Sequence, residues 1–134
     1  MTINVAAGAA SAAYALPAGT GGGTYIIQAV YNGTTNFLGY TDTSQDLVVS
    51  AAATATAAAS ASATFSGDVQ NVTLNATITS AAGTVNEGTE TFTILNGTTP
   101  VGDPVTVNVS AGAASAVYVL PAGTPGGTYI IQAV

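Results

Sequence analysis

Apolar and polar residues alternate with a period of two along several short stretches of this chain. The clearest stretch is 72–79, where Val72, Leu74, Ala76 and Ile78 alternate with threonine and asparagine. This pattern is typical of a strand that buries one face and exposes the other. Further runs of this kind lie at 25–31, 47–49, 92–94, 105–109 and 117–120, separated by turn sequences such as Asn32-Gly33 and Asn96-Gly97.

The alanine-rich segment 51–63 is open to two interpretations. Alanine favours a helix, but threonine and serine interrupt the run at alternate positions, and no large apolar residue would anchor a helical face. We therefore predict a linker over 51–64 that runs into a weak first strand, from about Ala57 to near Phe65. Seven short strands with frequent turn signals predict an all-β fold, an Ig-like antiparallel β-sandwich.

A long internal repeat sets the domain organisation. Residues 2–30 align without a gap with residues 106–134, and 24 of the 29 positions are identical. A period of 104 residues is too long for a solenoid but suits a tandem array of whole domains. We predict that 1–50 is the C-terminal part of one repeat. Residues 65–134 are then the N-terminal part of the next, without its last strand, in a piece cut out of phase with the domain.

The charged residues of this chain are few and all acidic. Asp and Glu number six, and there is no Lys, Arg, His, Cys or Trp. Neutralising phosphates needs cationic side chains, so the sequence argues against binding to nucleic acid. Without His or Cys there is no nucleophile–histidine pair, zinc cage or disulfide. We expect no enzymatic activity, no cofactor and no metal site.

The same composition suits a protein that is exposed outside the cell. No side-chain ion pair can form, and the carboxylates titrate only at about pH 4. Trypsin would find no Lys or Arg to cleave after. No apolar run reaches transmembrane length and no basic signal segment is visible. We predict a secreted or cell-surface location without membrane insertion, with any signal lying upstream.

One motif carries a resemblance to a known family. Residues 16–37 read LPAGTGGGTYIIQAVYNGTTNF, and later segments read LVV at 47–49 and VTLNATI at 72–78. Together they resemble the bacterial Ig-like repeats often called group 3, which occur in tandem in large secreted and surface proteins. The residues that match the family pattern are Tyr31, Gly33, Asn36 and Phe37. Thr34 stands where an acidic residue is usual, and 20–23 looks like an insertion. The resemblance implies a fold but says little about function, because such modules serve as spacers, adhesins and assembly units alike.

The strand at 25–31, repeated at 129–134, is apolar on both faces. We predict that Tyr25, Ile27, Ala29 and Tyr31 point into the core. The outward positions of both copies form an exposed apolar stripe, which marks an interface. The candidate assembly residues are Ile26, Gln28, Val30, Ile130, Gln132 and Val134.

Five asparagines lie in N-x-S/T sequons, which are acceptor sites in a secreted protein. An Asn- and Thr-rich chain also makes sequons by accident, and both interpretations stay open. The candidate glycosylation sites are Asn32, Asn71, Asn75, Asn96 and Asn108.

The acidic residues suggest two further sites, neither of which we favour. Asp42, Asp46 and Asp68 could bind calcium at a domain junction, but calcium needs six to eight oxygens and no dense acidic loop is present. Glu87 and Glu90 form a pair of the kind that glycosidases use. We interpret them instead as surface acids that keep the protein soluble.

The function that these patterns favour is structural. We predict a building block of an extracellular filament, stalk or surface coat, whose partners are neighbouring copies of itself. The alternative is an adhesin or carbohydrate-binding module with Tyr14, Tyr40 and Tyr118 as a platform for surface glycans. We interpret those tyrosines as core or corner residues. An amyloid-type fibre is a third hypothesis, opposed by the many turns.

Overall fold

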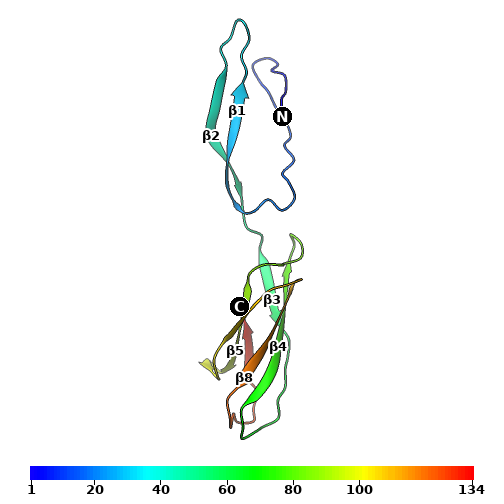
Figure 1. Cartoon of the computed structure of the whole chain (residues 1–134), viewed down its shortest axis with the longest axis vertical. Coiled ribbons are helices and arrows are strands. Elements are labelled where there is room, and N and C mark those ends of the chain that lie inside the picture. The colour runs from blue at the N-terminus through cyan, green and yellow to red at the C-terminus, as the bar shows by residue number, and fades with distance from the viewer. The chain divides into compact units, whose positions relative to one another are not determined.

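The computed structural model describes all residues from 1 to 134 and divides into two units, Met1–Ala51 and Ala52–Val134. The chain is built from strands, turns and loops, and every strand pair is antiparallel (Figure 1). None of its elements is a helix of the length and apolarity that a bilayer span requires. The prediction of an all-β antiparallel fold is confirmed.

The first unit contains a single hairpin. Strand β1 (Gly23–Tyr31) pairs with β2 (Tyr40–Val49), and a bulge shifts the register between Ile27 and Ala29. The connecting loop closes at Gly33, whose φ of 74° lies in the left-handed region. A Cβ at Gly33 would come within 2.7 Å of the backbone of Gly39, so only glycine fits there.

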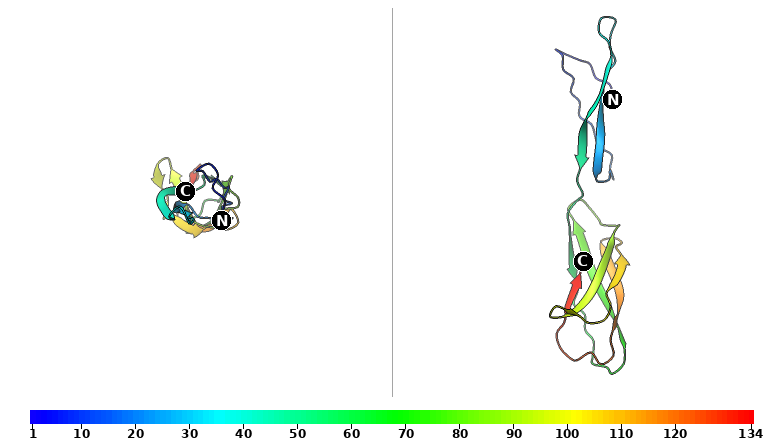
Figure 2. Two further views of the ribbon diagram at one scale, coloured as in Figure 1. Left: turned by 90° about the horizontal axis from the view of Figure 1, so that it is seen from above. Right: turned by 90° about the vertical axis from the view of Figure 1, so that its left-hand side faces the viewer.

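The second unit contains two sheets. The strands are β3 (Thr54–Ala58), β4 (Gln70–Ser80), β5 (Thr89–Asn96), β6 (Thr99–Pro100), β7 (Val105–Asn108), β8 (Ala113–Leu120) and β9 (Ile130–Ala133). One sheet has the order β3-β4-β8. In the other, β5 pairs with β6 and β7 along one edge and with β9 along the opposite edge (Figure 2).

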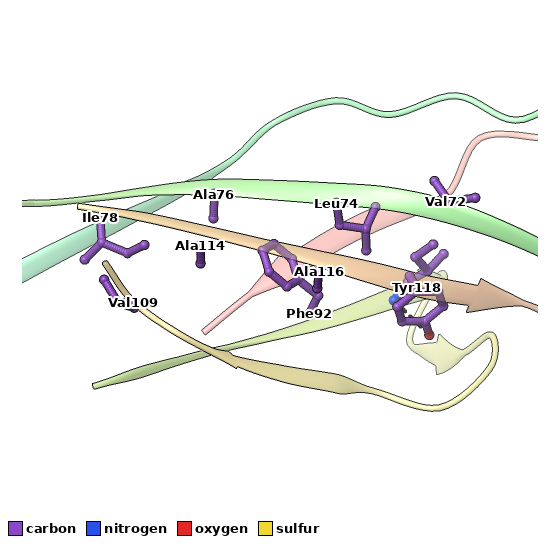
Figure 3. Close-up of a cluster of buried hydrophobic side chains, with 10 residues drawn as sticks. Val72, Leu74, Ala76, Ile78, Phe92, Val109, Ala114, Ala116 and Tyr118 are labelled. Atoms are coloured by element: carbon purple, nitrogen blue, oxygen red, sulfur yellow. Dashed lines mark hydrogen bonds between the residues drawn. The ribbon is translucent and has the colours of Figure 1, made fainter. Parts of the chain in front are cut away.

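The two sheets of the second unit share one buried core. Alternate side chains of β4 and β8 are buried, as are those of β5, and they meet between the sheets (Figure 3). The predicted alternation along 72–79 is therefore confirmed. The buried cluster consists of Val72, Leu74, Ala76, Ile78, Phe92, Ile94, Val109, Ala114, Ala116 and Tyr118.

Tyr118 is the largest fully buried side chain, and its polar end is satisfied within the core. Its hydroxyl donates to the carbonyl oxygen of Val101 at 2.7 Å and accepts from the amide of Ile94 at 3.4 Å. Because a buried hydroxyl needs such partners, Tyr118 ties β8 to the opposite sheet. For this residue the prediction of a core role is correct.

Glu90 is also buried, with 3% of its surface exposed, so the prediction of a surface acid is wrong for this residue. The reason is strand phase, since Glu90 alternates with Phe92 and Ile94 on the inward face of β5. The Thr56 hydroxyl, on β3, donates to Glu90 Oε1 at 2.8 Å. Glu87, by contrast, is exposed.

The first strand of the second unit lies earlier than predicted. It spans Thr54–Ala58, inside the segment interpreted as a linker, and residues 59–69 form no strand. Alanine does not show which face of a strand is buried, so the sequence pattern could not locate this strand. Its position is set by pairing with β4, from Thr54 opposite Ser80 to Ala58 opposite Ala76. The rejection of a helix here is confirmed.

The partly buried hydrogen bond between Thr56 and Glu90 yields a stability prediction. In a Thr56→Val variant the carboxyl of Glu90 loses its donor inside the core. The free energy of unfolding should fall by about 1–3 kcal/mol, as for other buried groups left unpaired. Urea denaturation measures it, with Thr73→Val on the exposed face of β4 as control, expected within about 0.5 kcal/mol of the parent. Equal stability of the two variants would contradict the assignment.

Candidate assembly surface

The two copies of the repeat adopt the same first turn. Ala7 and Ala111 both have a positive φ, of 49° and 51°, and each is followed by a glycine with positive φ. The turn is closed by an isolated bridge in both copies, from Ala6 to Ala9 and from Ser110 to Ala113. The local sequence therefore dictates this conformation in both units.

The second turn is also the same in both copies. The hydroxyl of Thr20 donates to the carbonyl of Pro17 at 2.6 Å, and that of Thr124 donates to Pro121 at 2.7 Å. The tyrosine hydroxyl that follows donates to a carbonyl four residues earlier, at 2.8 Å for Tyr25 and 2.7 Å for Tyr129. The geometry survives the exchange of glycine for proline at the accepting position.

The two copies of the repeat differ in the strands that pair with them and cover them. Residues 113–120 form β8 and pair with β4, whereas the equivalent residues 9–16 form no strand. Tyr118 is fully buried, and its counterpart Tyr14 is 70% exposed. The first unit has no strand equivalent to β4 or β5, so its copy of the repeat exposes side chains that the second unit buries.

The same contrast holds along the next strand. Tyr129 and Ile131 pack against the core of the second unit. Their counterparts Tyr25 and Ile27 on β1 are exposed, as is every other residue of that strand. The prediction that this strand turns one face into a core is correct for the second copy. It is wrong for the first, where no sheet covers β1.

The predicted assembly residues lie on the outward faces of these two strands, and all six are exposed. Four of them are large and apolar, with Ile26 and Val134 exposed by 69% and 72%. Exposed large apolar side chains of this kind are candidates for contact with a partner that would cover them. The six are Ile26, Gln28 and Val30 on β1, and Ile130, Gln132 and Val134 on or beside β9.

Strand β9 also has an unpaired backbone edge, which the sequence pattern did not reveal. Val134 and Thr91 exchange both backbone hydrogen bonds, at 3.1 and 2.7 Å. Because such pairs alternate along an antiparallel ladder, Gln132 also bonds to β5, and the amides of Ile131 and Ala133 point to the opposite edge. No strand pairs there. The counterpart of β9 in the first copy, β1, has β2 as its pairing partner.

The acidic residues do not assemble into a metal site. Asp42 and Asp46 lie on β2, Asp68 lies in a loop before β4, and nowhere do three candidate ligands come together. Asp42 Oδ1 accepts the amide hydrogen of Ser44 at 3.0 Å. Hydrogen bonds from the Ser44 side chain, and then from its backbone, lower the pKa of Asp42 below its ordinary value.

The tyrosines proposed for a sugar platform do not share one environment. Tyr118 is buried, while Tyr14 and Tyr40 are exposed. Exposure of Tyr14 and Tyr40 overturns the prediction that they are core or corner residues, because the first unit has no core. The five sequon asparagines are all exposed, namely Asn32, Asn71, Asn75, Asn96 and Asn108.

Comparison of the chain with protein-family models, with curated proteins and with solved structures gives no match.

The contrast between the two copies predicts a difference in amide exchange. Residues 113–120 are paired in a sheet and should exchange slowly, whereas residues 9–16, nearly identical in sequence, should exchange at rates close to those of an unstructured peptide. Hydrogen–deuterium exchange followed by NMR measures both segments in one sample. Similar protection of the two segments would show that the first copy is covered by partner strands.

Proposed function

We propose that this chain is a structural building block of an extracellular filament, stalk or surface coat, built from tandem Ig-like sandwiches of 104 residues each. The observation that carries the proposal is the near-identical repeat. The second copy packs against a core, but no strand pairs with the outer edge of its strand β9. The first copy has β2 paired with β1, but no core.

The two units complement each other strand by strand. Residues 23–30 and 127–134 have the same sequence, so β1 and β9 are equivalent elements of successive periods. Placing β2 beside β9, as it lies beside β1, gives a sheet of β7, β5, β9 and β2. That sheet would face β3, β4 and β8. With the short strand β6 counted together with β7, because both pair along one edge of β5, this makes seven antiparallel strand positions in two sheets, the number of an Ig-like sandwich.

The connection between periods supports a load-bearing array. Strand β2 ends at Val49 and β3 begins at Thr54, so four residues would join the last strand of one domain to the first strand of the next. A connection this short leaves little slack between neighbouring domains. The exposed sequons and the absence of Lys and Arg fit a protease-resistant surface protein.

No specific observation favours the alternative of an adhesin or carbohydrate-binding module. The burial of Tyr118 removes one member of the aromatic platform on which that hypothesis depended. The proposed role is non-catalytic, and its partners are further copies of the same domain.

An extended chain tests the proposal. Appending residues 31–134 after Val134 continues the array in phase and supplies β2 to the domain that ends with β9. Burying Leu47 and Val49 there should stabilise this domain by about 3 kcal/mol or more. Calorimetry should show a higher Tm for it, and electron micrographs should show particles that lengthen with each added period.

The matched control appends residues 52–134 instead, which omits β2 and breaks the phase. Equal Tm values for the two extended chains would contradict a 104-residue folding unit. Particles that do not lengthen with added periods would contradict the filament or stalk.

A further inference from the structure

A cavity of about 320 Å³ opens within the second unit, beside β9. Inward side chains of both sheets line it, among them Leu74 of β4, Ile94 of β5 and Ile131 of β9. Its wall also includes residues 61–66, the exposed Asp68, and 124–129. Its volume is about ten times the share of one liquid water, roughly 30 Å³. The cavity therefore has room for apolar side chains.

The cavity and the unpaired edge of β9 are parts of one site. Ile131 lines the cavity with its side chain, while its amide points to the edge that no strand occupies. In an added antiparallel strand, the residues opposite Tyr129 and Ile131 would place their side chains on the same inward face. A strand that binds this edge would thus fill the cavity as well.

The register of β1 and β2 identifies which strand fits. In the first unit, Gly23 lies opposite Val49 and Tyr25 opposite Leu47. Because residues 127–134 repeat 23–30 without a difference, the same register places Val49 opposite Gly127 and Leu47 opposite Tyr129. Gly127 and Tyr129 both line the cavity, so two apolar side chains of β2 would enter it.

The two charged groups of β2 lie away from the cavity in this placement. Asp42 lies opposite Ala29 in the hairpin, hence opposite Ala133, on the inward face of β9 but outside the lining of the cavity. Asp46 lies opposite Ile26 in the hairpin, hence opposite Ile130 on the outward face of β9. Ile130 is exposed, so the carboxylate of Asp46 would stay in water. Gln45 would lie opposite Ile131, where its amide is the only polar group brought to the inward face near the cavity.

We propose that β9 and the cavity beside it form an acceptor site for strand β2 of a second copy of this chain, with Leu47 and Val49 seated in the cavity. This inference rests on the proposed function, since it names the contact through which copies would assemble. Segment 127–134 would offer β2 the same residues in the same order as segment 23–30 does in the hairpin, because the two segments are identical in sequence.

The two possible partners of β2 differ in how far they bury its apolar side chains. On β1, Leu47 is 38% exposed and no sheet faces it, whereas on β9 both Leu47 and Val49 would be covered by the core. Burial of apolar surface therefore favours β9. Joining two copies has an entropic cost. The fraction of β2 strands that pair with β9 of another copy should therefore rise with the concentration of the chain.

The test uses the full chain, labelled with ¹⁵N, and a peptide of residues 39–50 with blocked ends. Amide exchange at Ile131 and Ala133 should slow at least about tenfold when the peptide is bound, because these amides gain partners. A Val48→Ser peptide, altered on the outward face, should act alike. A peptide with Leu47→Ser and Val49→Ser should bind at least about tenfold more weakly.

Unlabelled full chain then replaces the peptide to test the donor. Slower exchange at Ile131 and Ala133 with increasing unlabelled chain supports a second copy as the source of β2. Protection by the peptide alone overturns that source. Lack of protection at β9, or equal binding of the doubly substituted peptide, overturns the acceptor site. Neither result depends on filament length, so failure here is distinguishable from failure of the proposed function.

Discussion

A strand buries an apolar face only where a second sheet lies opposite, and this constraint separates the two copies of the repeat. Turns form from local sequence alone, as the matching hydrogen bonds at Thr20 and Thr124 show. Tyr14 and Tyr118 have nearly the same neighbours in sequence, yet only Tyr118 has β4 and β5 against which to pack. The second unit meets this requirement with its two sheets, and the first unit, a single hairpin, does not.

Sequence pattern predicted the strands whose apolar residues alternate and the turns that carry Asn-Gly. It located β4 and β5 because Val72, Leu74 and Phe92 mark the phase of their strands. It misplaced β3, because alanine looks alike on either face of a strand. It also assigned Glu90 to the surface by charge, although strand phase with Phe92 and Ile94 placed it inward.

The candidate site was predicted only in part. The outward residues of β1 and β9 followed from period-two alternation. The free edge and the cavity did not, because they depend on which strands pair, and pairing between distant segments leaves no local signal. The internal repeat does indicate a partner for β9, since its counterpart β1 pairs with β2.

Because the chain has no cationic side chain, contacts between copies would depend on strand pairing and apolar burial rather than on ion pairs. The most direct measurement uses a chain in which residues 52–105 are placed ahead of Thr2, in phase with the repeat. Solvent accessibility of Tyr14 is then followed by NMR. If one period is the folding unit, Tyr14 becomes as protected as Tyr118. A Tyr14 ring that stays accessible to solvent in a folded chain would contradict the claim that one period is the folding unit.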